Sequence, residues 1–206
     1  MIFVWNKKSF GDCLVVILKQ QTGEEQVISS GKVTALKQGD TIVGYNLFDV
    51  EKSLPSVADK VGQVFLSDKE IDQLNAMIFD AGFDTLLDKK ENRPRIVTGY
   101  VKECVDHPDS DHLHITKTEV SDGQVLQIVC GASNVQAGQK VVVATPGAMM
   151  PDGTLIFPGS LRGEESFGML CSAKELGVET AQKEKGILIL DEATEIGIPF
   201  APIYEK

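Results

Sequence analysis

The chain has 206 residues, of which 42% are hydrophobic and 24% charged, an ordinary composition for a globular protein with one large or two smaller cores. Its formal net charge is −10, with 10 basic and 13 acidic side chains in residues 1–90 and 10 basic and 17 acidic in residues 91–206. This balance excludes a protein that draws nucleic acid by long-range attraction, so any RNA binding must depend on a local cationic patch.

Targeting and redox features favour a cytoplasmic protein. The first residues lack the charged and apolar regions of a signal peptide, and no run approaches the roughly 20 apolar residues of a membrane helix. The four cysteines are widely separated and form no C-x-x-C pair, which favours reduced thiols over a disulfide framework. We therefore expect a cytoplasmic location without a membrane partner, and a buried, inert thiol at Cys130.

The first half begins with short apolar runs that are separated by turn residues. Gly11, Gly23 and Gly39 punctuate these runs in the manner of turns. The expected strands are Ile2–Asn6, Cys13–Gln20, Val27–Leu36 and Thr41–Phe48.

A helix is predicted after residue 67. Ser67 and Glu70 have the spacing of a capping box, in which the hydroxyl and the carboxylate satisfy backbone amides of the first turn. Apolar residues recur at helical spacing from Ile71 to Ile78, and Gly82 is placed for a left-handed C-terminal stop. Together with the strands, this helix predicts a small α+β domain of unknown function over residues 1–88.

The best linker candidate is the polar segment from Asp88 to Pro94. It has no apolar anchor, and its terminal proline disfavours a helix at the preceding residue. A second domain is therefore expected over residues 95–206.

The second half is rich in strand patterns, with turn signals at short intervals. Leu113 and Ile115 alternate with polar neighbours, as in a half-buried strand. Five or so strands and one short helix in about 110 residues fit a small closed barrel better than a parallel α/β sheet. The expected strands are Arg95–Val105, His112–Thr118, Val125–Cys130, Lys140–Thr145, Thr154–Phe157 and Gly186–Leu190.

An ordered series of motifs between Thr98 and Gly177 carries the functional signal. The motifs are His107-Pro-Asp-Ser-Asp-His-Leu113, Ile128-Val-Cys-Gly-Ala-Ser-Asn-Val135, Pro146-Gly-Ala-Met-Met-Pro-Asp-Gly153 and Leu161-Arg-Gly-Glu-Glu-Ser-Phe-Gly-Met-Leu-Cys-Ser-Ala-Lys-Glu-Leu-Gly177. Their order and spacing resemble the tRNA-binding domain near the N-terminus of the bacterial phenylalanyl-tRNA synthetase β subunit, and the related EMAP II-like domain. The two-domain layout most resembles the stand-alone tRNA-binding proteins of the YtpR type.

The resemblance covers residues 95–200 and implies a mainly-β OB-fold, a five-stranded Greek-key barrel, that binds structured tRNA as a non-catalytic accessory module. An arginine supplies a planar donor fork for phosphate, lysines supply point charges, and Ser or Asn side chains bond phosphate or the 2′-hydroxyl. Carried over residue by residue, the implied RNA-binding positions are Asn134, Lys140, Arg162, Ser166, Met169, Ser172 and Lys174.

This sequence departs from the family pattern in ways that reduce its positive charge. After the His-Pro-Asp-x-Asp start the family usually has a lysine, and this chain has His112. Glu164 and Glu165 lie directly after the Arg162-Gly163 pair. Both departures weaken the expected attraction to phosphate.

Structural alternatives stay open for most of the implied positions. Ser172 and Glu175 repeat the capping-box spacing, so Ser172 is either the N-cap of a short helix or an RNA contact. Asn134 is either a turn residue or a contact, and Met169 is either part of the core or a contact. For Arg162, a cation on an expected loop with little to pack against, the functional interpretation is favoured.

Other classes of site find less support. The three histidines, His107, His112 and His114, lie within eight residues and raise the hypothesis of a metal site, but no ligand spacing matches a zinc module. Nucleophile-elbow, Walker, dinucleotide-binding and zinc-protease motifs are missing from the sequence. We therefore expect no catalytic activity, no cofactor and no resident metal.

Two functions of different classes follow from the sequence. The first is binding of tRNA through the C-terminal OB-fold. The second, motivated by the excess of acidic residues, is a protein-interaction or assembly module with weak or lost RNA binding and a partner in the translation machinery. A homodimer is compatible with either function, because related stand-alone modules often pair.

Overall fold

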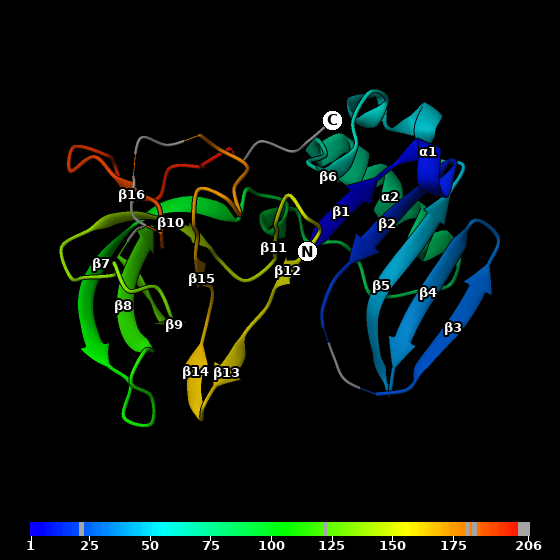
Figure 1. Ribbon diagram of the computed structural model, residues 1–206. Helices are drawn as coiled ribbons and strands as arrows, with labels where there is room; N and C mark the ends of the chain where they lie inside the picture. Colours follow the sequence, from blue (N-terminus) through cyan, green and yellow to red (C-terminus); the bar gives the residue numbers. More distant parts are fainter. Residues whose placement is uncertain (21–22, 122, 180–181, 183–184, 202–206) are drawn as a thin grey trace. The chain divides into compact units, whose positions relative to one another are not determined.

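The computed structural model describes residues 1–20, 23–121, 123–179, 182 and 185–201. They form two compact units, Met1–Arg93 (unit 1) and Pro94–Lys206 (unit 2), each with its own sheet (Figure 1). Over the described ranges the longest helix has 13 residues, and none combines the length and hydrophobicity that a bilayer crossing needs.

Unit 1 is a six-stranded antiparallel sheet in the order β3-β4-β5-β2-β1-β6. Its strands are β1 (Ile2–Trp5), β2 (Cys13–Ile17), β3 (Glu25–Ser30), β4 (Val33–Gln38), β5 (Thr41–Phe48) and β6 (Gly62–Val64). Its helical elements are α1 (Lys7–Phe10), α2 (Asp68–Asp80) and the 3₁₀ helices η1 (Glu51–Ser53), η2 (Pro55–Val57) and η3 (Lys89–Glu91).

The predicted helix after Ser67 is confirmed as α2. The Ser67 hydroxyl accepts a hydrogen bond from the Glu70 amide at 3.3 Å, and the Glu70 carboxylate accepts one from the Ser67 amide at 2.7 Å. Gly82, with φ of 91°, follows the last turn in the left-handed conformation that ends a helix. The apolar face of α2 packs on the sheet in a core that includes Trp5 and Tyr45, both fully buried.

The prediction of a single strand over Val27–Leu36 is wrong. The chain reverses at Gly31, whose φ of 57° suits a tight hairpin turn, and forms β3 and β4 with Ser30 opposite Val33. β3 then lies at the edge of the sheet, where the side chains of Val27 and Ile28 are 62% and 44% exposed.

Unit 2 is mostly β-structure with a sheet in the order β15-β10-β7-β8-β9, and β16 also pairs with β10. Two short hairpins, β11–β12 and β13–β14, lie in the connection between β10 and β15. The strands are β7 (Ile96–Asp106), β8 (His114–Ser121), β9 (Gln124–Cys130), β10 (Lys140–Ala144), β11 (Ala148–Met149), β12 (Leu155–Ile156), β13 (Gly159–Leu161), β14 (Glu164–Ser166), β15 (Met169–Leu170) and β16 (Ile189–Leu190).

The sheet of unit 2 curls so that the segment after β13 reaches the free edge of β9 (Figure 1). The amide of Phe167 donates to the carbonyl of Gln127 at 2.8 Å, and the amide of Val129 donates to the Ser166 hydroxyl at 3.1 Å. These bonds join the two edges of the curled sheet.

β10 is buried on both of its faces. Val141 and Val143 point into one apolar cluster with Val101 and Ile128, while Val142 points into a second cluster with residues of β11 and β12. Cys130 belongs to the first cluster, is 7% exposed, and has its thiol pKa raised by burial, which confirms the buried thiol expected there.

Of the two alternatives for Ser172, the N-cap of a short helix is realised as the cap of a single turn. The amide of Leu176 donates to the carbonyl of Ser172 at 3.2 Å. Gly177, with φ of 66°, ends the turn before a helix is established.

Candidate nucleic-acid interface

Arg162 lies at the tip of the β13–β14 hairpin. Leu161 pairs with Glu164, so Arg162 and Gly163 form the two-residue turn. Both have positive φ, 47° and 89°, which is the backbone of a type I′ turn. Glycine adopts this conformation freely, whereas a residue with a Cβ pays about 1–2 kcal/mol for it. The arginine therefore occupies a position where its side chain brings no conformational benefit.

The Arg162 guanidinium is available to a ligand. The residue is exposed, and its side chain has no hydrogen bond or ion pair with any residue that the structure describes. The nearby carboxylate of Glu164 instead lies 3.5 Å from the side-chain amide of Gln127, which also donates to the Glu165 carbonyl at 2.9 Å. The neighbouring acids thus leave the cation unpaired.

His107 holds this hairpin in place. Its ring is 3% exposed, and its Nδ1 accepts a hydrogen bond from the Asp109 amide at 3.1 Å. Nε2 must then carry the proton, and it donates to the Leu161 carbonyl at 3.3 Å. Through these two hydrogen bonds the His107 ring connects the loop between β7 and β8 to Leu161, the residue before the β13–β14 turn. His107 therefore fixes the backbone next to Arg162 without contacting the Arg162 side chain.

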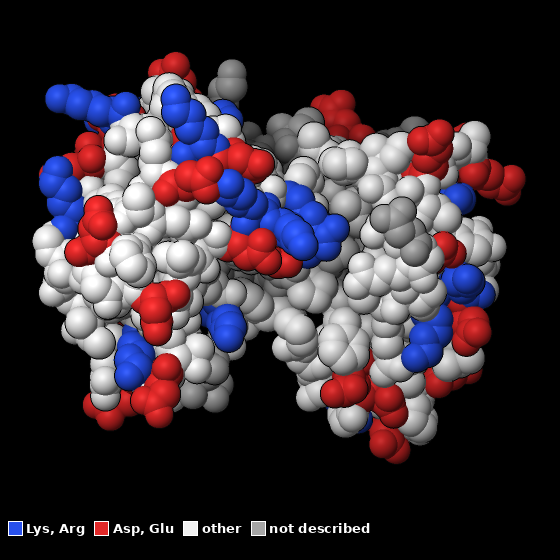
Figure 2. Space-filling model, turned by 180° about the vertical axis from the view of Figure 1, so that it is seen from behind, with Lys and Arg blue, Asp and Glu red and all other residues white. Residues whose placement is uncertain are grey.

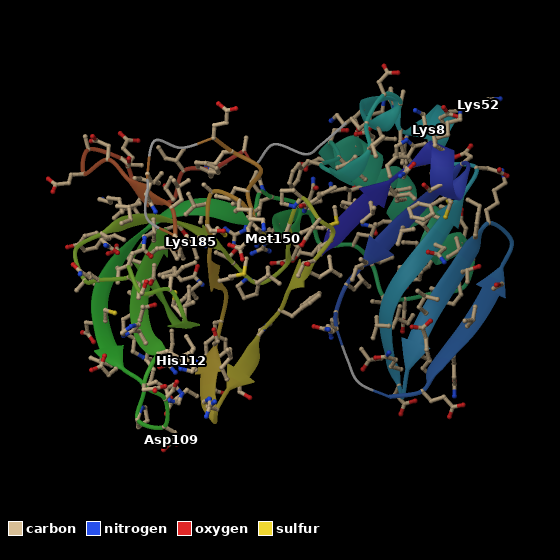
Figure 3. All side chains as sticks on the ribbon, viewed as in Figure 1. Lys8, Lys52, Asp109, His112, Met150 and Lys185 are labelled. Carbon is tan, nitrogen blue, oxygen red and sulfur yellow. The ribbon has the colours of Figure 1, made fainter. Side chains whose placement is uncertain are left out.

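The loop between β7 and β8, which His107 holds, carries acidic side chains at its surface. Figure 3 shows Asp109 and His112 at the end of this loop, next to the β13–β14 hairpin. His112 Nδ1 lies 2.8 Å from the Asp111 carboxylate, and this contact holds the pKa of Asp111 below its ordinary value. His114 Nδ1 lies 3.2 Å from Asp106. The histidines are therefore engaged pairwise with aspartates or with the backbone.

The metal hypothesis for the histidine cluster finds no support in the geometry. No group of three or more His, Cys, Asp or Glu side chains within the described residues could hold a metal ion.

Asn134 is buried and fully engaged. Its Nδ2 donates to the Ile187 carbonyl at 3.0 Å, and its Oδ1 accepts from the Ile187 amide at 3.0 Å. The Asn134 side-chain amide thus satisfies both the amide and the carbonyl of Ile187, as the backbone of a neighbouring β-strand would. A Cβ on Gly186 would collide with the Asn134 amide group, so the glycine is required for this pairing.

Ser166 and Ser172 also have internal partners. The Ser166 hydroxyl, 5% exposed, accepts from the Val129 amide and donates to the Gly168 carbonyl at 3.2 Å. The Ser172 hydroxyl donates to Glu175 Oε2 at 2.6 Å and accepts from the Glu175 amide at 3.3 Å, completing a capping box. The structural alternatives retained for Ser172 and Asn134 thus have their hydrogen bonds, and an RNA contact at these positions stays a prediction.

A hollow of about 330 Å³ brings several of the implied positions together. Its lining includes Met169, Ser172 and Glu175 with Gly131, Ala132 and Gly186. Asn134 does not line the hollow itself, but its side chain is hydrogen-bonded to the lining residue Ile187. Exposed lysines, Lys174 and Lys185, neighbour the lining residues in sequence, and Figure 3 labels Lys185. The Glu175 carboxylate lies in the lining, so the hollow itself carries an acidic group.

Two further lysines lie on outward strand faces. Lys140 is placed with its ammonium 5.1 Å from the Tyr100 ring centroid. Lys117, on β8, donates to Gln127 Oε1 at 2.7 Å. The sequence interpretation missed Lys117 and Lys185. Lys117 lies two residues after Ile115, so the expected alternation assigned it to the apolar face of Leu113 and Ile115. The structure instead buries Thr116, Thr118 and Val120 and leaves Lys117 exposed, so this local pattern gave no signal for it.

Comparisons with known proteins match both units. Residues 96–199 match the family described as "Putative tRNA binding domain", and residues 20–90 match a "Domain of unknown function (DUF4479)". The "Putative tRNA-binding protein YtpR" of Bacillus subtilis is 39% identical over 199 residues, which cover 95% of this chain and 97% of that protein.

Other relatives cover about half of this chain. The phenylalanine–tRNA ligase β subunit of Sulfurimonas denitrificans is 54% identical over 99 residues, 48% of this chain and 12% of that subunit. The corresponding subunit of Porphyromonas gingivalis is 47% identical over 112 residues, 53% of this chain and 13% of that subunit. The chain thus spans nearly all of the Bacillus protein and only a small part of each ligase subunit. The resemblance inferred from the motif series is confirmed.

Proposed function

The chain belongs to the family of the putative tRNA-binding domain, and on this premise we propose that unit 2 binds structured tRNA without catalysing a reaction. The observation that carries the proposal is Arg162, an exposed cation without a partner among the described residues, held at a hairpin tip in a conformation that costs free energy. Such a conformation is retained most readily where the side chain has a ligand.

The strand order supports an OB-fold for this unit. With β7, β8, β9, β10 and the β14–β15 segment as its five strands, neighbours in the sheet follow the order of a closed Greek-key barrel. OB-folds bind nucleic acid with the face of their second and third strands and the loops after the first and fourth strands. Arg162 lies in the second of these loops and His112 in the first.

The outward face of β8 and β9 favours contact with the RNA backbone. Neither strand contains a Phe, Tyr or Trp, whereas modules that bind unstacked bases use such aromatic platforms. The Lys117 ammonium on this face uses one donor for Gln127 and has others for phosphate or the 2′-hydroxyl. Structured RNA, whose bases stay paired, is the ligand that suits such a surface.

Roles can be assigned to the seven implied positions within this proposal. Arg162 contacts phosphate directly, and Lys140 and Lys174 add charge. Asn134, Ser166 and Ser172 act through shape, since they fix the backbone around the hollow, and Met169 lines that hollow.

The test is a titration of folded tRNA into the full chain at several salt concentrations. We expect micromolar or weaker binding that falls with salt, because few phosphates are neutralised. Arg162→Asn, which tolerates positive φ, should weaken binding about tenfold or more, the value of a charged hydrogen bond. Lys8→Asn, an exposed lysine of unit 1, is the control. Equal affinity of Arg162→Asn and the wild type would refute this site.

A second function, a protein-interaction or assembly module, is favoured by the excess of 17 acidic over 10 basic residues in 91–206. Affinity capture from a nuclease-treated lysate separates the two functions. A partner from the translation machinery that survives removal of RNA supports the second function, and loss of all captured material with the RNA supports the first.

A further inference from the structure

A second cationic feature lies outside the site described above, in the segment that joins the two units. Residues 88–95, here named the joining segment, contain four basic and two acidic side chains within a chain of net charge −10. Figure 2 shows Lys and Arg side chains (blue) and Asp and Glu side chains (red) on the same face, so positive charge is present on the surface despite the negative net charge.

The backbone of the joining segment is fixed by hydrogen bonds. The Asp88 carboxylate caps η3 by accepting from the Lys90 amide at 2.9 Å. Asn92 pairs with the backbone of Leu66, accepting from its amide at 3.3 Å and donating to its carbonyl at 2.6 Å. The side chains of this segment therefore project from an ordered scaffold.

The first residue of unit 2 to be fixed follows shortly afterwards. The carbonyl of Arg95 accepts from the amide of Thr145 at 2.8 Å and from its hydroxyl at 2.9 Å. Only Arg93 and Pro94 lie between the bonds of Asn92 and those of Arg95.

Two cations of the joining segment have no partner in the described ranges of the chain. Lys89 Nζ lies 2.6 Å from Asp72 Oδ1, so this lysine of the segment forms an ion pair with an aspartate of α2. Lys90 and Arg93 are exposed, and neither side chain has a hydrogen bond or ion pair with the described part of the chain. Since the Asp88 carboxylate is occupied as a cap, it does not neutralise them by direct contact.

We propose that Lys90 and Arg93 form a second contact of the chain for the phosphate backbone of RNA, in addition to the site in unit 2. The proposal rests on the proposed function, because the ligand is the same. Because the backbone that carries the two cations is already fixed, binding of phosphates orders only their side chains and not the main chain. Concentrating free cations in this segment allows an acidic chain to bind a polyanion.

The test uses the full chain with both cations reversed, Lys90→Glu and Arg93→Glu, and a control with the same change in charge, Lys8→Glu and Lys52→Glu. Lys8 and Lys52 are exposed in α1 and η1 of unit 1 and have no partner among the described side chains (Figure 3). The dissociation constant for folded tRNA is measured from low to physiological salt for each, and thermal unfolding verifies that each variant is folded.

We expect the reversal in the joining segment to weaken binding at low salt about tenfold more than the control. It should also reduce the slope of log affinity against log salt by about 1.5, because two phosphate contacts are lost. The neutral pair Lys90→Gln and Arg93→Gln should reproduce the loss of slope with a smaller loss of affinity.

Three outcomes distinguish the proposals. If the reversal and its control weaken binding equally, only net charge matters and the second contact is refuted. If the wild type binds and Arg162→Asn binds weakly while the joining-segment variants match the wild type, the second contact fails and the proposed function stands. If the wild type does not bind tRNA at all, both fail.

Discussion

At Arg162 the backbone conformation is expected to lower the stability of unit 2, while the side chain is expected to strengthen RNA binding. Its φ of 47° disfavours any residue with a branched or bulky side chain. Arg162→Asn should therefore raise the free energy of unfolding of unit 2 by up to about 1 kcal/mol while it weakens RNA binding. Urea unfolding at neutral pH measures the first effect. A matched Gly163→Ala variant, with φ of 89° at that site, should lower stability by about 1 kcal/mol. Destabilisation by Arg162→Asn would contradict this account of the turn.

Asn134 is the opposite case, a polar side chain that serves the interior. Asn134→Ala leaves both the amide and the carbonyl of Ile187 without their partner, which should cost about 2–4 kcal/mol. Ser133→Ala, at the exposed neighbour, should change stability by less than about 0.5 kcal/mol. Chemical denaturation compares the two variants. Equal stability of both would show that the Ile187 pairing contributes nothing.

At the residue scale, the sequence predicted which side chain is exposed better than it predicted the hydrogen-bond partners of the buried polar side chains. Arg162 was expected to be a free cation on a loop, and its side chain is unpaired among the described residues. The partners of Asn134 and Ser166 lie 53 and 37 positions away in the chain. No local pattern encodes such pairings, because they depend on how the barrel brings distant segments together. The same limit hid the role of His107, whose partner Leu161 is 54 residues distant.

The capping box of α2 makes the stability of this helix depend on pH through Glu70. Burial raises the pKa of Glu70, but hydrogen bonds from Ser67 and Ser56 outweigh this effect and hold the pKa below its ordinary value of 4.5. Because the folded pKa is depressed, the stabilisation is complete above the unfolded pKa and is lost as the pH falls through the folded pKa. Unit 1 should therefore lose stability below about pH 4.5.

Glu70→Gln tests this coupling. The variant should be about 1–2 kcal/mol less stable at pH 7, and its stability should depend less on pH between 3 and 6. Asp59→Asn, an exposed acid of the same unit, is the control and should leave the pH profile unchanged. If Glu70→Gln retains the pH dependence of the wild type, another carboxylate is responsible.

Long, strongly patterned elements were predicted better than short ones. α2 and the main strands have apolar residues in a regular pattern, and their positions agree with the sequence interpretation to within a few residues. The two-residue strands β12 and β16 lie inside the expected strands Thr154–Phe157 and Gly186–Leu190, whereas β11 and β15 were not expected, since two residues carry no periodicity. The Val27–Leu36 error arose because the turn at Gly31 lies between two runs of similar character.

At the scale of the whole molecule, each unit has apolar clusters of its own. Among the residues that the structure describes, one cluster lies within unit 1 and two lie within unit 2. We therefore expect two unfolding transitions in calorimetry. Glu70→Gln should move only one of them and Asn134→Ala only the other. A single transition that responds to both variants would contradict independent folding of the two units.

The connection between the units has a practical consequence for dissecting them. Trypsin cleaves after lysine and arginine, yet it does not cleave when proline follows, because the ring removes the amide hydrogen and crowds the scissile bond. The Arg93–Pro94 peptide is of this kind, and Arg95 is tied down by Thr145. Limited trypsin digestion should thus spare the Arg93–Pro94 peptide, and within the joining segment it should cut after the exposed Lys90. A fragment that begins at Glu91 then keeps Arg93 attached to unit 2, so a division at the Arg93–Pro94 boundary itself calls for a different endopeptidase.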